Sequence, residues 1–289
     1  MSLEGVRVTP EWLSLREPAD AGARARDLGR RLAEHLAPRP RTDETLVIHD
    51  LGAGTGSMGR WLAPQLPGPQ HWVLHDRDPD LLDVAATDRP GPAADGGAVT
   101  VEARRSDIAG LSPGALAGAS VVTASALLDM LTEPDLTELV ASCSAAACPV
   151  LLTLSVNGHV GLSPVEPFDS RLRRAFNDHQ RRGTAGERLL GPDAFDSATA
   201  SFQRLGAEVH TAPSPWRLGP ADHELIATWL TGWVAAACQQ DPSLAADAGA
   251  YTSRRLAQLH AGQLLVTVWH SDLLALPAQQ SSAKRDDSA

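Results

Sequence analysis

Cysteine is scarce in this sequence, and the spacing of the few cysteines excludes two kinds of stabilised fold. The 289 residues include only Cys143, Cys148 and Cys238. An odd count builds no closed disulfide framework, and the spacing does not match the paired ligands of a zinc site. We therefore expect no metal site, and we interpret the three thiols as small buried side chains in a reducing cytoplasm.

An excess of positive charge is also missing. The formal net charge is −10 and the pI is near 5.4. Proteins that hold a nucleic-acid backbone usually present a basic field, so this balance weighs against RNA or DNA and favours a small-molecule substrate.

Long apolar segments are absent as well. Residues 1–12 have no basic stretch followed by an apolar one, and no uninterrupted apolar run reaches the roughly 18 residues of a membrane span. We therefore expect a soluble, cytoplasmic protein without a membrane partner. The oligomeric state stays open.

What the sequence does contain is a glycine-rich turn at residues 45–59, TLVIHDLGAGTGSMG. The apolar run before Asp50 predicts a buried strand, and a helix is expected to start near Ser57. Gly52, Gly54 and Gly56 let a ligand approach the backbone where a Cβ would block it. A carboxylate at Asp50 would repel a pyrophosphate but accept hydrogen bonds from an ammonium or a hydroxyl.

Two ligands fit this turn on sequence grounds. Gly54, Gly56 and Gly59 complete the dinucleotide fingerprint G-x-G-x-x-G, with Asp76 at a suitable distance for a ribose, which indicates an NAD(P)-dependent oxidoreductase. The whole run DLGAGTG resembles the first motif of the class I S-adenosylmethionine-dependent methyltransferases. A turn that binds nothing is the third interpretation.

Later segments resemble this methyltransferase family in the same order. Residues 71–76 predict a second strand, and the following DRDPDLL resembles the second motif, in which Asp76 would take both ribose hydroxyls and Asp78 would cap the next helix. After a third strand, the resemblance implies that Asp107 binds the adenine amine and Ile108 packs on the ring. It also adds Arg77 and Ser125 to the cofactor residues.

The fourth strand, residues 119–124, leads into Ser-Ala-Leu-Leu-Asp-Met at 125–130. Methyltransferases that act on bases commonly have an Asn- or Asp-Pro-Pro-aromatic sequence here, and this chain does not. The segment instead resembles small-molecule methyltransferases of the trans-aconitate type, with Asp129 at a polar position. Met130 stands where that type has an aromatic residue, which leaves the substrate undetermined.

Residues 11–37 carry apolar side chains at helical spacing and predict one or two amphipathic helices. In the family such a helix often covers the cofactor, and an arginine on it pairs with the cofactor's carboxylate. Arg24 is the first choice, with Arg16 or Arg26 as alternatives. A solvated arginine face explains the same pattern.

The resemblance implies an α/β fold with a doubly wound, Rossmann-like sheet of seven strands in the order 3-2-1-4-5-7-6, the last strand antiparallel. We expect a helical cover at 1–44, a methyltransferase domain at 45–276 with helical lid insertions at 157–191 and 213–262, and a disordered tail at 277–289. The last strand is assigned to 263–270. A run of arginines in the first insertion suggests an anionic acceptor, although a solvated helix face explains it too: Arg171, Arg173, Arg174, Arg181 and Arg182.

If the acceptor must lose a proton, the chain needs a general base. His179 is the first candidate because polar residues surround it in the sequence and because imidazole accepts a proton near neutral pH. His159 and Asp129 are the alternatives. A protein that binds the cofactor and regulates without catalysis also remains possible on the sequence alone.

Overall fold

The computed structural model describes residues 8–37, 44–108, 114–183 and 187–277. The expected tail at 277–289 therefore lies outside the described residues from position 278 on. None of the described helices is long and apolar enough to span a bilayer.

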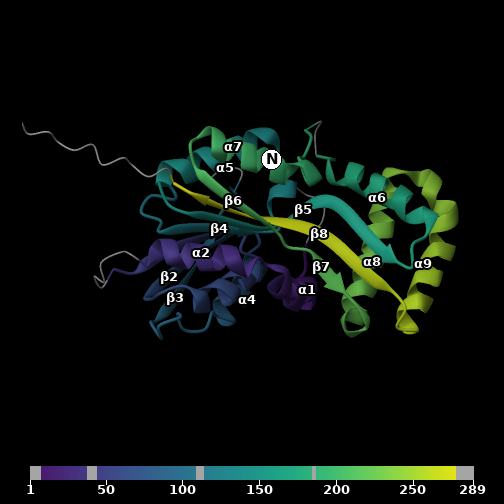
Figure 1. The fold of residues 1–289 in the computed structure, drawn as a ribbon, viewed down its shortest axis with the longest axis horizontal. Coiled ribbons are helices and arrows are strands. Elements are labelled where there is room, and N and C mark those ends of the chain that lie inside the picture. The colour runs from purple at the N-terminus through teal and green to yellow at the C-terminus, as the bar shows by residue number, and fades with distance from the viewer. Residues whose placement is uncertain (1–7, 38–43, 109–113, 184–186, 278–289) are drawn as a thin grey trace, which may run out of the picture.

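One mixed sheet runs through these residues, in the order β3-β2-β1-β4-β5-β8-β6, with the short β7 paired to β8 (Figure 1). The inner pairs from β3 to β5 are parallel, whereas β8 is antiparallel to each of its partners. The predicted order and the antiparallel last strand are confirmed, with β7 added. The strands are β1 Leu46–Leu51, β2 Gln70–Asp76, β3 Val99–Arg105, β4 Val121–Ser125, β5 Val150–Ser163, β6 Glu208–Pro213, β7 Trp216–Leu218 and β8 Leu265–Leu276.

Helices cover both faces of this sheet, as alternating side chains in the central strands require. Val121, Leu151 and Leu274 belong to one apolar cluster, and their neighbours Val122, Leu152 and Leu273 belong to another. Strand residues alternate between the two faces, so both faces are buried. The helices are α1 Pro10–Ala23, α2 Arg26–Leu36, α3 Ser57–Leu62, α4 Pro79–Thr87, α5 Glu133–Ala146, α6 Pro167–Gln180, α7 Ala194–Arg204, α8 His223–Gln240 and α9 Ala245–His260; the 3₁₀ turns are η1 Ala63–Gln65, η3 Leu128–Met130, η4 Gly191–Asp193, η5 Pro220–Asp222 and η6 Pro242–Leu244.

The two late segments form a helical lobe at one end of the molecule. There β5 and β8 run on together, and α6, α8 and α9 gather around them (Figure 1). The helical lobe has its own apolar core, in which Leu172, Ile226, Trp233 and Tyr251 are buried. Trp12 and neighbouring side chains of α1 pack against this core. The N-terminal helix thus joins the helical lobe to the sheet domain.

Asp272 on β8 fixes the position of that helix. Its carboxylate is fully buried and accepts hydrogen bonds from the backbone N–H groups of Ala25 and Leu154, each at 2.7 Å, and from the Ser214 hydroxyl. Leu154 has φ +56° at an irregularity of β5. Burial raises the pKa of Asp272, and the three donors act in the opposite direction. One side chain therefore holds the α1–α2 corner, the irregular strand β5 and the loop before β7.

We expect Asp272→Ala to lower the free energy of unfolding by roughly 3–5 kcal/mol, because three buried donors lose their acceptor. Urea unfolding measures this change. The matched control is Asp247→Ala, at an aspartate that is 66% exposed; it should change stability by less than about 0.5 kcal/mol. Equal effects of the two substitutions would show that Asp272 does not organise this junction.

Candidate functional site

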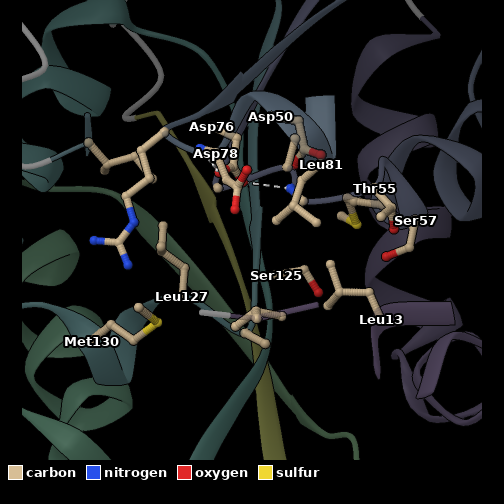
Figure 2. A pocket seen from close by; sticks show the side chains of 18 of the residues that line it. Leu13, Asp50, Thr55, Ser57, Asp76, Asp78, Leu81, Ser125, Leu127 and Met130 are labelled. Carbon is tan, nitrogen blue, oxygen red and sulfur yellow. Dashed lines mark hydrogen bonds between the residues drawn. The ribbon is translucent and has the colours of Figure 1, made fainter. Parts of the chain in front are cut away.

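A cavity of about 570 Å³ opens at the carboxyl ends of β1, β2 and β4. This edge of a doubly wound sheet is where ligands bind in such folds, and the volume suits a small molecule. Figure 2 shows Leu13 and Ser57 on one side of the cavity, Leu127 and Met130 on the other, and Asp50 and Asp76 between them. Chain segments that are far apart in sequence thus surround one space.

The glycine turn forms the floor of the cavity with backbone atoms. Gly52 and Gly54 have φ of +64° and +53°, which disfavours other residues. A Cβ on Gly52 would lie 3.0 Å from Leu127, and one on Gly54 would lie 3.0 Å from Leu13. Gly56, also predicted as a binding residue, does not line the cavity; with φ +83° it precedes α3 and lies against α4.

Asp50 is buried in the wall of the cavity with one oxygen unsatisfied. Its Oδ1 accepts a hydrogen bond from the Thr123 hydroxyl at 2.7 Å, whereas Oδ2 has no partner among the described residues. Burial raises the pKa of Asp50 to about 7, although Thr123 and the positive charge of Arg24 favour the ionised form. A cationic donor placed at Oδ2 would restore the missing interaction.

Arg24 is the second buried group with polar atoms that lack hydrogen-bond partners among the described residues. Its Nη2 donates to the hydroxyl oxygens of Ser57 and Ser125 at 3.0 and 3.1 Å, and both serines line the cavity. The Nε and Nη1 atoms have no partner among the described residues. Burial lowers the pKa of Arg24, and Asp20 and Asp50 act in the opposite direction. The first-choice arginine thus lies behind the cavity wall, while Arg26 is exposed.

The other predicted cofactor residues come together at the same cavity. Asp76 accepts from the N–H of Gly54 through Oδ2 at 2.8 Å and from the N–H of Asp78 through Oδ1 at 2.9 Å. These bonds orient the carboxylate and leave lone pairs for hydroxyl donors. Asp78 caps α4, as predicted. The remaining members of the predicted set also line the cavity: Arg77, Asp107, Ile108 and Ser125.

The two candidate histidines do not line this cavity. His179 lies 3.2 Å from Oε1 of Gln239, where α6 meets α8 in the helical lobe. His159 is exposed on β5, where its N–H donates to the Asn157 side chain at 3.3 Å. Both therefore lie in segments that extend away from the glycine turn.

Asp129 is placed differently, between the cavity-lining residues Leu127 and Met130. Burial raises the pKa of Asp129 to about 6, while a backbone hydrogen bond and the charge of Arg16 favour the ionised form. Its Oδ2 lies 3.5 Å from the amide nitrogen of Gln180, the last residue of α6. Of the three candidate bases, Asp129 is the one beside the cavity.

One face of α1 contributes a group of lining residues, of which the sequence analysis named only Arg16, as an alternative to Arg24: Trp12, Leu13, Arg16 and Asp20. Arg16 donates to Asp20 through Nε at 2.8 Å and through Nη2 at 3.1 Å. Asp20 also accepts from Nε1 of Trp216 at 2.9 Å. The spacing i, i+4, i+8 in the sequence was the available signal, but it is equally typical of any helix with one buried face.

The arginine run of the first insertion lies elsewhere, since none of its five members lines the cavity. Arg181 forms an ion pair with Asp193 at 2.8 Å, and Arg171 lies 3.7 Å from Asp247 on α9. The positions of these arginines therefore do not support the prediction of an anionic acceptor that was based on them.

A buried pair of histidines lies next to the cavity and was not predicted either. Nδ1 of His49 and Nε2 of His75 are 2.9 Å apart, and Nδ1 of His75 is 2.9 Å from the Ser106 hydroxyl, which lines the cavity. Burial lowers the pKa of His49 and brings that of His75 to about 4, which favours the neutral form of both rings. Among the described residues, no group of three or more His, Cys, Asp or Glu side chains is arranged to hold a metal ion.

Comparisons with known proteins gave matches among solved structures alone, since no family model and no curated protein matched. Phosphoethanolamine N-methyltransferase 2 from Haemonchus contortus is 16% identical over 88% of this chain, with a TM-score of 0.40, and the chain spans 53% of that protein. An S-adenosylmethionine-dependent methyltransferase from Geobacter sulfurreducens, in complex with S-adenosylhomocysteine, is 16% identical over 93% of this chain and 98% of its own, with a TM-score of 0.45. The YcgJ protein from Bacillus subtilis is 12% identical over 88% of this chain and 100% of its own, with a TM-score of 0.47.

Proposed function

We propose that the chain is an S-adenosylmethionine-dependent methyltransferase that acts on a small molecule. The observation that carries the proposal is the pair of buried, unsatisfied groups beside the glycine turn. Within the part of the chain that the structure describes, Oδ2 of Asp50 lacks a donor, and Nε and Nη1 of Arg24 lack acceptors. Buried polar groups are normally paired, so two such groups of opposite charge, one in the cavity wall and one behind it, indicate a ligand that carries both partners.

The amino-acid end of S-adenosylmethionine has those partners. Its ammonium group would satisfy Asp50, and its carboxylate would satisfy Arg24 or the two serines that Arg24 contacts. Asp76 offers a carboxylate to the ribose, and Asp107 with Ile108 would meet the adenine. The residues present therefore fit this cofactor over its whole length.

The competing dinucleotide explains less of the site. An NAD(P) molecule would use Asp76 for its ribose but would place a pyrophosphate near the buried acid Asp50. It also gives no role to the free donors of Arg24, which lies behind the two serines. The methyltransferase proposal accounts for both residues.

The chain's part in the reaction is alignment, exclusion of water and, where needed, acceptance of a proton. When bound, the cofactor supplies a methyl group on a sulfonium, whose departure as a neutral thioether needs no acid from the protein. Apolar side chains line the cavity and would keep the acceptor and the methyl group in a dry space: Leu13, Leu127, Met130 and Leu131. Asp129 stands beside these walls and is our choice for the base that takes the acceptor's proton.

The cofactor assignment predicts a specific pH dependence of S-adenosylhomocysteine binding. The ammonium group pairs with the ionised form of Asp50, whose pKa is raised to about 7, so protonation competes with binding at lower pH. We expect the Kd to be about tenfold higher at pH 6 than at pH 8. Asp50→Asn should bind weakly at both values and lose this dependence, as isothermal titration would show.

The matched control is Asp129→Asn, which removes another carboxyl of raised pKa but should keep the wild-type pH dependence of binding. A ligand at 100 times its Kd adds about 2.7 kcal/mol of stability, so a thermal-shift comparison with NADH is also informative. Stabilisation by NADH and not by S-adenosylhomocysteine would refute the cofactor assignment. Measured methyl transfer would then exclude a regulator that binds the cofactor without catalysis.

A second prediction concerns the proton acceptor. Asp129→Asn should lower kcat by roughly 10²–10⁴-fold with little change in the Kd of S-adenosylhomocysteine, because a base acts on the acceptor and not on the cofactor. The wild-type rate should rise with pH through about 6, where Asp129 ionises, and the variant should lack this rise. Release of S-adenosylhomocysteine, with an acceptor found by screening, provides the assay.

His179→Ala is the paired variant, since His179 was the first choice on the sequence and contacts Gln239 instead of the cavity. We expect the kcat of His179→Ala to stay within a few-fold of the wild-type value. The opposite pattern, a large loss in His179→Ala and an unchanged Asp129→Asn, would assign the base to the histidine and require movement of α6.

A further inference from the structure

The inner face of α1 places one guanidinium, that of Arg16, in the wall of the cavity. The Arg16 side chain is 16% exposed and lines the cavity together with the apolar residues Trp12, Met130 and Leu131. Its positive charge lowers the pKa of Asp129, the proposed base. Arg16 thus lines the cavity that the proposed base Asp129 adjoins, which is where our proposal puts the methyl acceptor.

Arg16 is held in one orientation before any ligand binds. Asp20 takes two of its donors, Nε and Nη2, which form the side-on fork of the guanidinium. The guanidinium carbon lies 5.0 Å from the centre of the Trp216 ring, and Trp216 also donates to Asp20. Both partners come from parts of the structure that Asp272 and the helical lobe hold in place.

This arrangement leaves the end-on fork of Arg16 available. A guanidinium has five N–H donors, and the two on Nη1 make no hydrogen bond within the part of the chain that the structure describes. The remaining N–H of Nη2 points with them in the plane of the group. Such a fork matches the two oxygens of a carboxylate or of a phosphate.

Two nearby acids already have hydrogen-bond donors within the described residues. Asp20 already accepts from Arg16 and Trp216, and Oδ2 of Asp135 accepts from both the N–H and the hydroxyl of Thr132, at 3.1 and 2.6 Å. Asp129 lies near the amide nitrogen of Gln180. Arg16 therefore contributes N–H donors without partners among the described residues, and Asp129 remains the carboxylate available as a base.

We propose that Arg16 binds an oxyanion of the methyl acceptor through its end-on fork, and that Asp20 and Trp216 position it for this task. The acceptor is then a small organic acid, a carboxylate or a phosphate ester, with an apolar body that packs against Trp12, Met130 and Leu131. This inference rests on the proposed methyltransferase function. It makes Arg16 a specificity-determining residue, in contrast to Arg24, which serves the cofactor.

The test uses the full-length protein saturated with S-adenosylhomocysteine and four probes: benzoate, phenyl phosphate, the neutral benzamide and the cationic benzylamine. Isothermal titration should show benzoate or phenyl phosphate binding more tightly than benzamide by roughly ten- to hundredfold, the value of charge-assisted hydrogen bonds. The two acids distinguish a carboxylate from a phosphate ester as the natural anionic group.

The decisive variant is Arg16→Met, which keeps an apolar stem and removes the guanidinium. It should abolish the preference for the acid over benzamide and leave the Kd of S-adenosylhomocysteine within about twofold of wild type. Arg16→Lys keeps the charge without the fork and should restore the preference only in part. Arg174→Met, an exposed arginine of α6, is the matched control and should behave as wild type.

Five results would overturn the inference. A large loss of S-adenosylhomocysteine affinity in Arg16→Met would make Arg16 a cofactor residue, and tighter binding of benzylamine by wild type would make this a site for cations. An acid preference that persists in Arg16→Met would assign it to another residue. Equal binding of benzoate, phenyl phosphate and benzamide by wild type would remove the oxyanion site while leaving the methyltransferase function intact. If wild type does not bind S-adenosylhomocysteine at all, the proposed function fails first, and this inference fails with it.

Discussion

The buried carboxylate of Asp272 connects three parts of the chain that meet at one junction. It accepts from Ala25 at the α1–α2 corner, from Leu154 in the irregular part of β5, and from Ser214 before β7. A charged group without exposure is costly unless every oxygen has donors, and here the donors come from backbone as well as side chain. This contact helps to hold α1 over the sheet, and α1 supplies one wall of the cavity.

Two other buried charged groups, beside the cavity, lack some of their hydrogen-bond partners within the described part of the chain. Asp50 and Arg24 are as deeply buried as Asp272, yet each has atoms without partners among the described residues. A protein that keeps such orphans gives up stability in the free state and gains a site whose electrostatics are arranged before the ligand arrives. Asp272 maintains this arrangement indirectly, because Arg24 is the residue directly before Ala25.

The same helix therefore serves two ends of one reaction in our proposal. Arg24, at the C-terminal end of α1, faces the cofactor's amino-acid group through Ser57 and Ser125. Arg16, two turns earlier, faces the acceptor region beside Asp129. Their separation along a rigid helix would set the distance between a cofactor carboxylate and an acceptor oxyanion, which is a geometric basis for choosing one acid over another.

The resemblance to the methyltransferase family implied the order of the strands. The sequence by itself determined the glycine turn, its acid, Asp76 after the second strand, and Asp107 and Ile108 after the third. These features are local: a buried strand shows as an apolar run, a left-handed turn shows as glycine, and a motif keeps its residues within a short stretch. Only the tertiary structure decided that Arg24 has donors without partners among the described residues, that Arg16 lines the cavity, and that His179 contacts Gln239 away from it. Those facts depend on pairs far apart in the chain, such as Ala25 with Asp272 and Asp20 with Trp216. Periodicity assigns a residue to the buried face of a helix, but the partner that this face meets is set by long-range packing, which no local pattern encodes.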